Sequence, residues 1–198
     1  MPSAFDKPVI TANRFGVPAA AAVAQTMTLV TTLTASSSTS LSYTSFASAS
    51  YKSYKLIFSR ILPATNNVDL RVQASVDGGA NYGALWSYGT GNFDNSNAWS
   101  STSGNAQTNN MLIYNTSNAA SATYSGVYGE LTFNYSPVAG TGPALTGMLG
   151  ARNANGGAYK NPQIQHGVYD NATEVNALKF LFAAGNIASG TIRIYGIT

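Results

Sequence analysis

The amino-acid sequence predicts an all-β protein, an antiparallel β-sandwich of jelly-roll type with an extended N-terminal arm. Short segments with alternating apolar residues recur along the chain, which is the period of a strand with one buried face. Clusters of Gly, Asn and Ser separate these segments, as turns between antiparallel strands do. Long windows lack the helical spacing of apolar residues, and the one short helical candidate is Ala19–Ala24. About eight short strands with such turns fit a two-layer sandwich.

The clearest alternation lies in "DLRVQASVDGGANY", which ends in the tight-turn signal Asp77-Gly78-Gly79. Strands are expected within 26–34, 35–46, 51–62, 69–76, 111–115, 127–136, 144–152, 177–183 and 190–197. Their inward residues should form the core; the clearest are Tyr54, Leu56, Phe58, Leu70, Val72, Ala74, Val76, Leu131, Phe133, Tyr135, Leu178, Phe180, Phe182, Ile192 and Ile194, whereas Arg193 and Tyr195 should face outward.

Residues 1–26 are expected to form an extended attachment arm, and residues 27–198 the sandwich. Three prolines, Pro2, Pro8 and Pro18, make the first segment extended and non-helical. A signal peptide is the alternative for this segment, but Pro18 interrupts its very short apolar run. The apolar side chains expected to attach the arm to a neighbour are Phe5, Val9, Ile10, Phe15 and Val17.

The stretch from Trp86 to Asn110, "WSYGTGNFDNSNAWSSTSGNAQTNN", is predicted to be a long loop because it holds no aliphatic residue larger than Ala. Aromatic side chains among Asn and Ser are typical of sugar-stacking sites and protein interfaces. The alternative is that the rings cap one end of the sandwich. The candidate contacts for a glycan or a partner are Tyr82, Trp86, Tyr88, Phe93 and Trp99.

The composition argues against several classes of protein. Charged residues make up only 9% of the chain, against roughly 25% in an ordinary soluble domain. The net charge of +3 comes from scattered residues with no cluster of Lys or Arg, so nucleic-acid binding is not expected. Cysteine is absent, which excludes disulfides and thiolate metal sites. No apolar run approaches the ~20 residues of a membrane span, and no cofactor is expected.

Catalysis is not expected either. His166 is the only histidine, and Asp170 lies four residues on, but no nucleophile motif accompanies them, so His166 is interpreted as a surface-loop residue. Asp77 and Asp94 are the nearest approach to a glycosidase pair, yet both stand in turn-like contexts where Asp bonds its own backbone. The segment "DNSNAW" suggests a calcium loop only faintly. We expect no catalytic and no metal-ligating residues.

Two segments resemble a family of tailed-bacteriophage virion proteins. They are "SYTSFASASYKSYKLIFSRILPATNNVDLRVQASVDGGANY", which starts at Ser42, and "LKFLFAAGNIASGTIRIYGI", which ends at Ile197. The resemblance implies a β-sandwich module, usually trimeric, in tail fibres, spikes or head-surface proteins on the outside of the virion. It also implies that the second segment is a terminal hairpin, and it brings no catalytic residues.

The expected function is therefore that of a non-enzymatic virion structural protein. The arm would dock on a tail, connector or capsid protein, and the sandwich would face outward as a tail-fibre or receptor-binding protein that contacts host-surface glycan. One alternative is a head decoration protein that staples neighbouring capsomers. Another is a secreted carbohydrate-binding module.

Overall fold

The computed structural model is an antiparallel β-sandwich. The structure describes residues 26–46, 50–66, 68–83, 86–93, 99–107, 111–114, 126–134, 142–152, 159–169 and 174–198. Within these ranges there are strands and turns but no α-helix, and so no helix long and apolar enough to cross a membrane. The predicted arm, apart from Thr26, and the helical candidate Ala19–Ala24 lie outside the described residues. The jelly-roll topology stays a prediction.

Twelve strands form two sheets in the described part of the chain. The eight-stranded sheet has the order β1-β12-β3-β8-β9-β10-β5-β6, and the four-stranded sheet has the order β2-β11-β4-β7. The strands are β1 (Met27–Ser38), β2 (Leu41–Tyr43), β3 (Ser53–Pro63), β4 (Leu70–Ser75), β5 (Trp86–Phe93), β6 (Trp99–Gln107), β7 (Met111–Tyr114), β8 (Val127–Asn134), β9 (Ala144–Arg152), β10 (Tyr159–Tyr169), β11 (Ala177–Phe182) and β12 (Ile187–Ile197).

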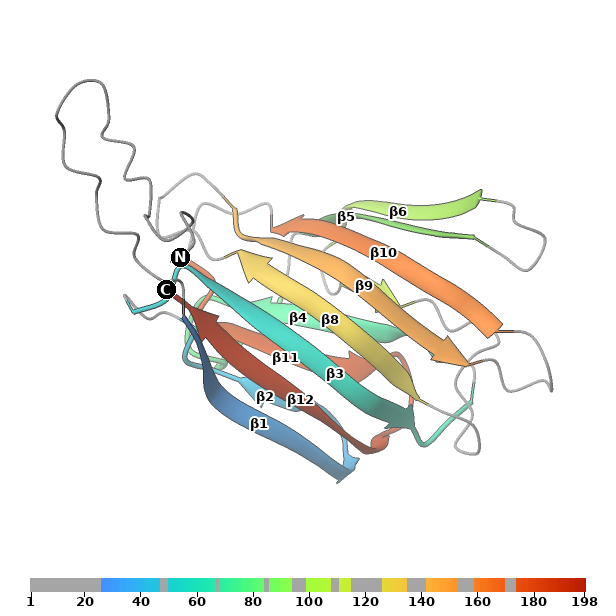
Figure 1. Cartoon of the computed structure of the whole chain (residues 1–198), viewed down its shortest axis with the longest axis horizontal. Coiled ribbons are helices and arrows are strands. Elements are labelled where there is room, and N and C mark those ends of the chain that lie inside the picture. The colour runs from blue at the N-terminus through green and yellow to red at the C-terminus, as the bar shows by residue number, and fades with distance from the viewer. Residues whose placement is uncertain are drawn as a thin grey trace, which may run out of the picture.

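The small sheet covers only part of the large one. Figure 1 shows β2, β4 and β11 behind the part of the large sheet that contains β12, β3 and β8, while β5 and β6 lie at the far end. The last strand, β12, is an interior strand because it pairs with β1 on one side and with β3 on the other. The C-terminal strand is therefore hydrogen-bonded to a neighbour on both sides.

The predicted alternation accounts for the core. Leu56, Phe58, Leu131 and Phe133 of the large sheet are buried against residues of the small sheet. Of the inward residues predicted from sequence, Val76 is only partly buried and Tyr135 lies outside the described residues; all the others are buried. Arg193 is exposed and Tyr195 half-buried, as expected for the outer face.

An aromatic cluster closes one end of this core. The ring of Phe46 meets the rings of Tyr54 and Phe133 edge to face, with centroid distances of 4.9 and 5.1 Å. The buried hydroxyl of Tyr54 donates a 2.7 Å hydrogen bond to the carbonyl oxygen of Phe46. The phenol is therefore both packed and satisfied, as a buried tyrosine must be.

The expected terminal hairpin is wrong. β11 and β12 follow one another in the chain, but β11 belongs to the small sheet and β12 to the large one. The chain crosses between the sheets at residues 183–186. There the amide of Ala183 donates a 2.8 Å hydrogen bond to the carbonyl oxygen of Asp69, and the amide of Ala64 donates one of 2.8 Å to the carbonyl oxygen of Asn186. Both strands bury one apolar face, and placing them in opposite sheets lets both faces meet in one core.

The predicted loop after Leu85 is also wrong. Much of this stretch forms β5 and β6, which pair with each other from Trp86 to Gln107, and β5 pairs in turn with β10. His166 lies on β10 and not in a loop. The inner face of these strands carries polar side chains, because Thr90, Gln163 and Gln165 are buried there. This polar interior is the reason that no apolar alternation signals the strands.

Candidate functional site

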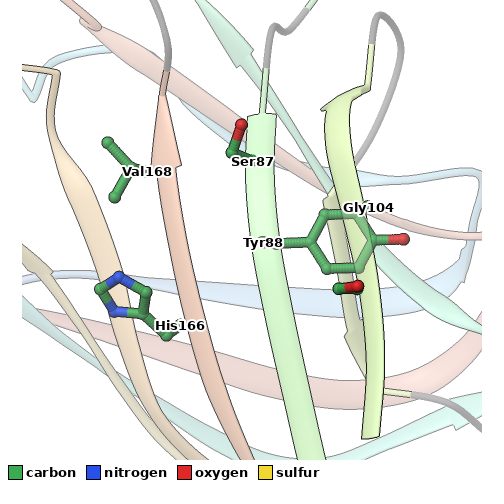
Figure 2. Close-up of a pocket in the computed structure, with 6 residues that line it drawn as sticks. Ser87, Tyr88, Gly104, His166 and Val168 are labelled. Atoms are coloured by element: carbon green, nitrogen blue, oxygen red, sulfur yellow. The ribbon is translucent and has the colours of Figure 1, made fainter.

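An open groove lies on the outer face of the large sheet, the face of β10 opposite the one that Met111 of the small sheet meets at Gly167. Its volume is about 420 Å³, and β10, β5 and β6 supply its walls. Figure 2 shows His166 and Val168 extending from β10, and Ser87 and Tyr88 extending from β5. The lining residues are Ser87, Tyr88, Ser103, Gly104, His166 and Val168.

The strand register brings these residues together. Val168 of β10 lies opposite Ser87 of β5. His166 lies opposite Gly89, and Gly89 lies opposite Ser103 of β6. A Cβ atom built on Gly89 would meet nothing within 4 Å, so the space above this position is open. An imidazole and a hydroxyl thus flank a backbone floor in one row across three strands.

Tyr88 borders the groove, but its side chain lies on the opposite face of the sheet, where it packs against the core beside its cross-strand partner Gly167. Its ring extends from β5 towards β6, where its cross-strand partner is Gly104, which has no side chain to displace it (Figure 2). Burial raises the pKa of Tyr88, a nearby Arg71 opposes that rise, and Asp69 adds to it. The phenol therefore stays protonated at neutral pH and can donate a hydrogen bond.

Apolar side chains continue from the groove along the same face of the sheet. Ile164 lies two residues from His166 on β10 and is 54% exposed. Its cross-strand partner on β9, Met148, is 51% exposed. The groove therefore opens onto a flat surface that is partly apolar, which is typical of a face that meets another molecule.

The groove lacks the parts of a hydrolytic centre within the described residues. Its lining holds one imidazole and no carboxylate. Asp170, the partner considered from sequence, lies outside the described residues. The described part of the chain also contains no group of three His, Asp, Glu or Cys side chains able to hold a metal ion. The arrangement can bind polar groups.

The carboxylate of Asp77 accepts hydrogen bonds within its own turn. It accepts a 2.6 Å hydrogen bond from the hydroxyl of Ser75, and bonds of 2.9 and 2.8 Å from the backbone amide and side-chain amide of Asn81. These bonds, led by the one from Ser75, lower the pKa of Asp77 from 3.8 to about 2. The prediction that this Asp serves its turn is confirmed; Asp94 lies outside the described residues.

The structure separates the aromatic residues that the sequence suggested for a glycan site. Trp86 is fully buried, and its ring packs edge to face on Tyr169 with centroids 5.5 Å apart. It caps the core, so it has no face to offer a ligand, and its prediction as a contact is wrong. Of the candidates whose side chains are described, Tyr88 borders the groove, but its ring is turned towards the core side of the sheet.

The other three are not brought to the groove in the described part of the structure. Tyr82 lies by the turn after β4, half-buried, with the ammonium of Lys179 4.1 Å from its ring centroid. Phe93 and Trp99 are backbone partners where β5 and β6 pair, but their side chains are not among those described. The predicted attachment residues Phe5, Val9, Ile10, Phe15 and Val17 also lie outside the described residues.

Sequence reasoning missed Ser87, Ser103, Gly104 and Val168. The only available signal was the alternation of Gly89 and Gly91 in "YGTGN", which leaves one face of β5 bare. Comparisons with protein-family models, with curated proteins and with solved structures found no match.

Proposed function

We propose that this chain is a non-enzymatic structural protein of a bacteriophage virion that binds neutral host-surface glycan in the groove between β10, β5 and β6. The observation that carries the binding role is the groove, in which the side chains of Ser87, Ser103 and His166 share one face of the sheet around the open position at Gly89. The resemblance of two sequence segments to phage virion proteins carries the virion role.

The chemistry of the groove suits a sugar ring. The hydroxyls of a pyranose exchange hydrogen bonds with Ser and His side chains, and its apolar C–H face can pack on an apolar side chain such as Val168. The described lining contains neither a carboxylate nor a Lys or Arg side chain. A neutral sugar therefore fits better than a sulfated or acidic one, which would demand a cationic partner.

An open groove of this kind gives a weak contact by itself. A virion presents many copies of a surface protein, and simultaneous engagement converts weak single contacts into firm adhesion. In this proposal residues 1–26 dock on a tail, connector or capsid protein through Phe5, Val9, Ile10, Phe15 and Val17, and the sandwich faces outward. The low charged fraction, 9%, suits a body that is packed among other virion proteins.

Binding of neutral oligosaccharides to the full chain tests the first part of the proposal. His166→Ala should weaken binding about tenfold, since loss of a hydrogen bond to a ligand typically removes about 1–1.5 kcal/mol. The control is Tyr128→Ala, because Tyr128 is a 48% exposed tyrosine of β8 that does not line the groove. Equal binding by wild type and His166→Ala, with both folded, would refute the glycan site.

Analysis of purified phage particles tests the second part. Particles should contain the chain, and deletion of residues 1–25 should reduce its incorporation. A few copies at the tail support the adhesion role, whereas a large, regular number of copies on the capsid supports the decoration alternative and contradicts tail attachment. Absence from particles would refute the virion role and leave the glycan measurement unaffected.

A further inference from the structure

The first strand of the large sheet has an edge that no other described strand covers. β1 pairs with β12 on one side only, and in the described part of the structure nothing hydrogen-bonds along its other side. Alternate residues of an edge strand point their N–H and C=O groups away from the sheet. Twelve residues make β1 a long edge, compared with three in β2 and four in β7 at the edges of the small sheet.

Between Thr31 and Ser36, the residues of β1 do not protect this edge. Natural edge strands are usually blunted by lysine, proline, a bulge or short length, since a bare edge pairs with another strand. The sequence of β1, "MTLVTTLTASSS", contains no charged residue and no proline. A register shift lies between Leu29 and Thr31, and Ser37 has a positive φ of 53°, but from Thr31 to Ser36 the pairing with β12 is regular. Six consecutive residues therefore present an unbroken edge.

The same strand is firmly held, so its edge is presented in a fixed conformation. Ala35 is buried in the core, and Val30 and Leu33 pack against it. Met27 and Leu29, by contrast, are 54% and 52% exposed on a strand whose opposite face is packed. Half-exposed apolar side chains beside an open backbone edge favour an added strand, which would cover both.

We propose that β1 pairs antiparallel with β1 of a second copy of this chain, across a two-fold axis. A copy of β1 matches this edge in length, and neither strand brings a charge to the junction, so no like charges meet across it. An antiparallel pair of identical strands is closed, because each supplies the same edge to the other. The pairing continues the large sheet from one molecule into the next. It does not depend on the glycan site or on the virion role.

Solution mass measures this pairing directly. The wild-type full chain should show twice the 20.6 kDa of one chain, and Thr34→Lys should return it to one chain, with dimerisation weakened at least about tenfold. Thr34 is exposed, and its neighbours in the row, Thr191 and Ser59, are uncharged, so no cation lies directly opposite the lysine. Unfolding by denaturant confirms that Thr34→Lys remains folded.

The matched control is Ser101→Lys on β6, an exposed residue at the opposite edge of the same sheet. It should leave the dimer intact. If Ser101→Lys breaks the assembly as well, β1 pairs head to tail with β6, and the two-fold arrangement is wrong. A monomeric or trimeric wild-type chain would overturn the proposal equally.

Cysteine cross-linking tests the symmetry. The chain has no cysteine, so any disulfide-linked dimer must come from an introduced residue. In an antiparallel pair only the residue at the two-fold axis faces its own copy, within the ~5.5 Å Cα separation that a disulfide tolerates. Single Cys substitutions from Thr31 to Ser36 should therefore cross-link strongly at one position and weakly elsewhere. Uniform or absent cross-linking contradicts pairing through β1.

Discussion

Phe58 of β3 and Phe180 of β11 meet edge to face across the two sheets, with their ring centroids 5.5 Å apart. Both rings are buried, Phe58 in the large sheet and Phe180 in the small one. Such aromatic pairs stabilise a fold beyond the area that they bury. This contact ties together two sheets that share no strand, at the centre of the scaffold.

Phe180→Ala should lower the free energy of unfolding by about 3–5 kcal/mol, because it removes a buried ring and leaves a cavity between the sheets. Chemical denaturation measures the change. Ile164→Ala serves as the control, since Ile164 is exposed on the outer face, and its effect should stay within about 0.5 kcal/mol. Comparable losses in the two variants would mean that the sheets do not pack through this contact.

Gly147→Ala should destabilise the large sheet by about 1–3 kcal/mol. Gly147 has φ of +154°, and an added Cβ would press on the carbonyl oxygen of Glu130 and lie 2.8 Å from the Cα of Leu131. Gly150→Ala is the matched control on the same strand, because its Cβ would only touch the ring of Tyr128 at 3.6 Å. The measurement is the midpoint temperature of thermal unfolding of both variants. A midpoint for Gly147→Ala equal to that of the wild type would contradict the β8–β9 register.

Asp77 should make the stability of the protein depend on pH in the acid range. Its folded-state pKa of about 2 lies below the ordinary value of 3.8. The folded state therefore favours the ionised form, and the resulting stabilisation is fully present above about pH 4 and is lost as the pH falls towards 2. The stability difference between wild type and Asp77→Asn should shrink over that interval. A difference that is constant with pH would show that the carboxylate is not bonded in the turn.

Gly89→Val should abolish glycan binding while the fold stays intact. The added side chain enters open space above the floor of the groove, and a β-branched residue suits a strand. Gly167→Ala is the contrasting variant, because its Cβ would press on the sulfur of Met111 and should lower the stability instead. Binding assays and melting curves separate the two effects. Undiminished binding by Gly89→Val would place the ligand elsewhere.

The sequence by itself determined the all-β class and most of the core. Wherever one strand face is apolar and the other polar, as in Leu70–Ser75 or Ala177–Phe182, the alternation gives both the strand and its buried side. The turn at Asp77 followed from local chemistry as well, since the carboxylate bonds residues only two and four positions away. These features depend on residues that are close together in the sequence, so a sequence pattern can predict them.

Tertiary structure alone decided the groove and the sheet to which each strand belongs. The sequence did not reveal β5, β6 and β10, because the buried side chains Thr90, Gln163 and Gln165 are polar. Backbone pairing with neighbouring strands defines these three strands instead. Trp86 looked like a ligand contact, yet its ring lies in the core. The crossing from β11 to β12 likewise follows from the need of two apolar faces to meet in one core. Hydrogen bonds and burial between distant segments set these features, and no pattern within one segment encodes them.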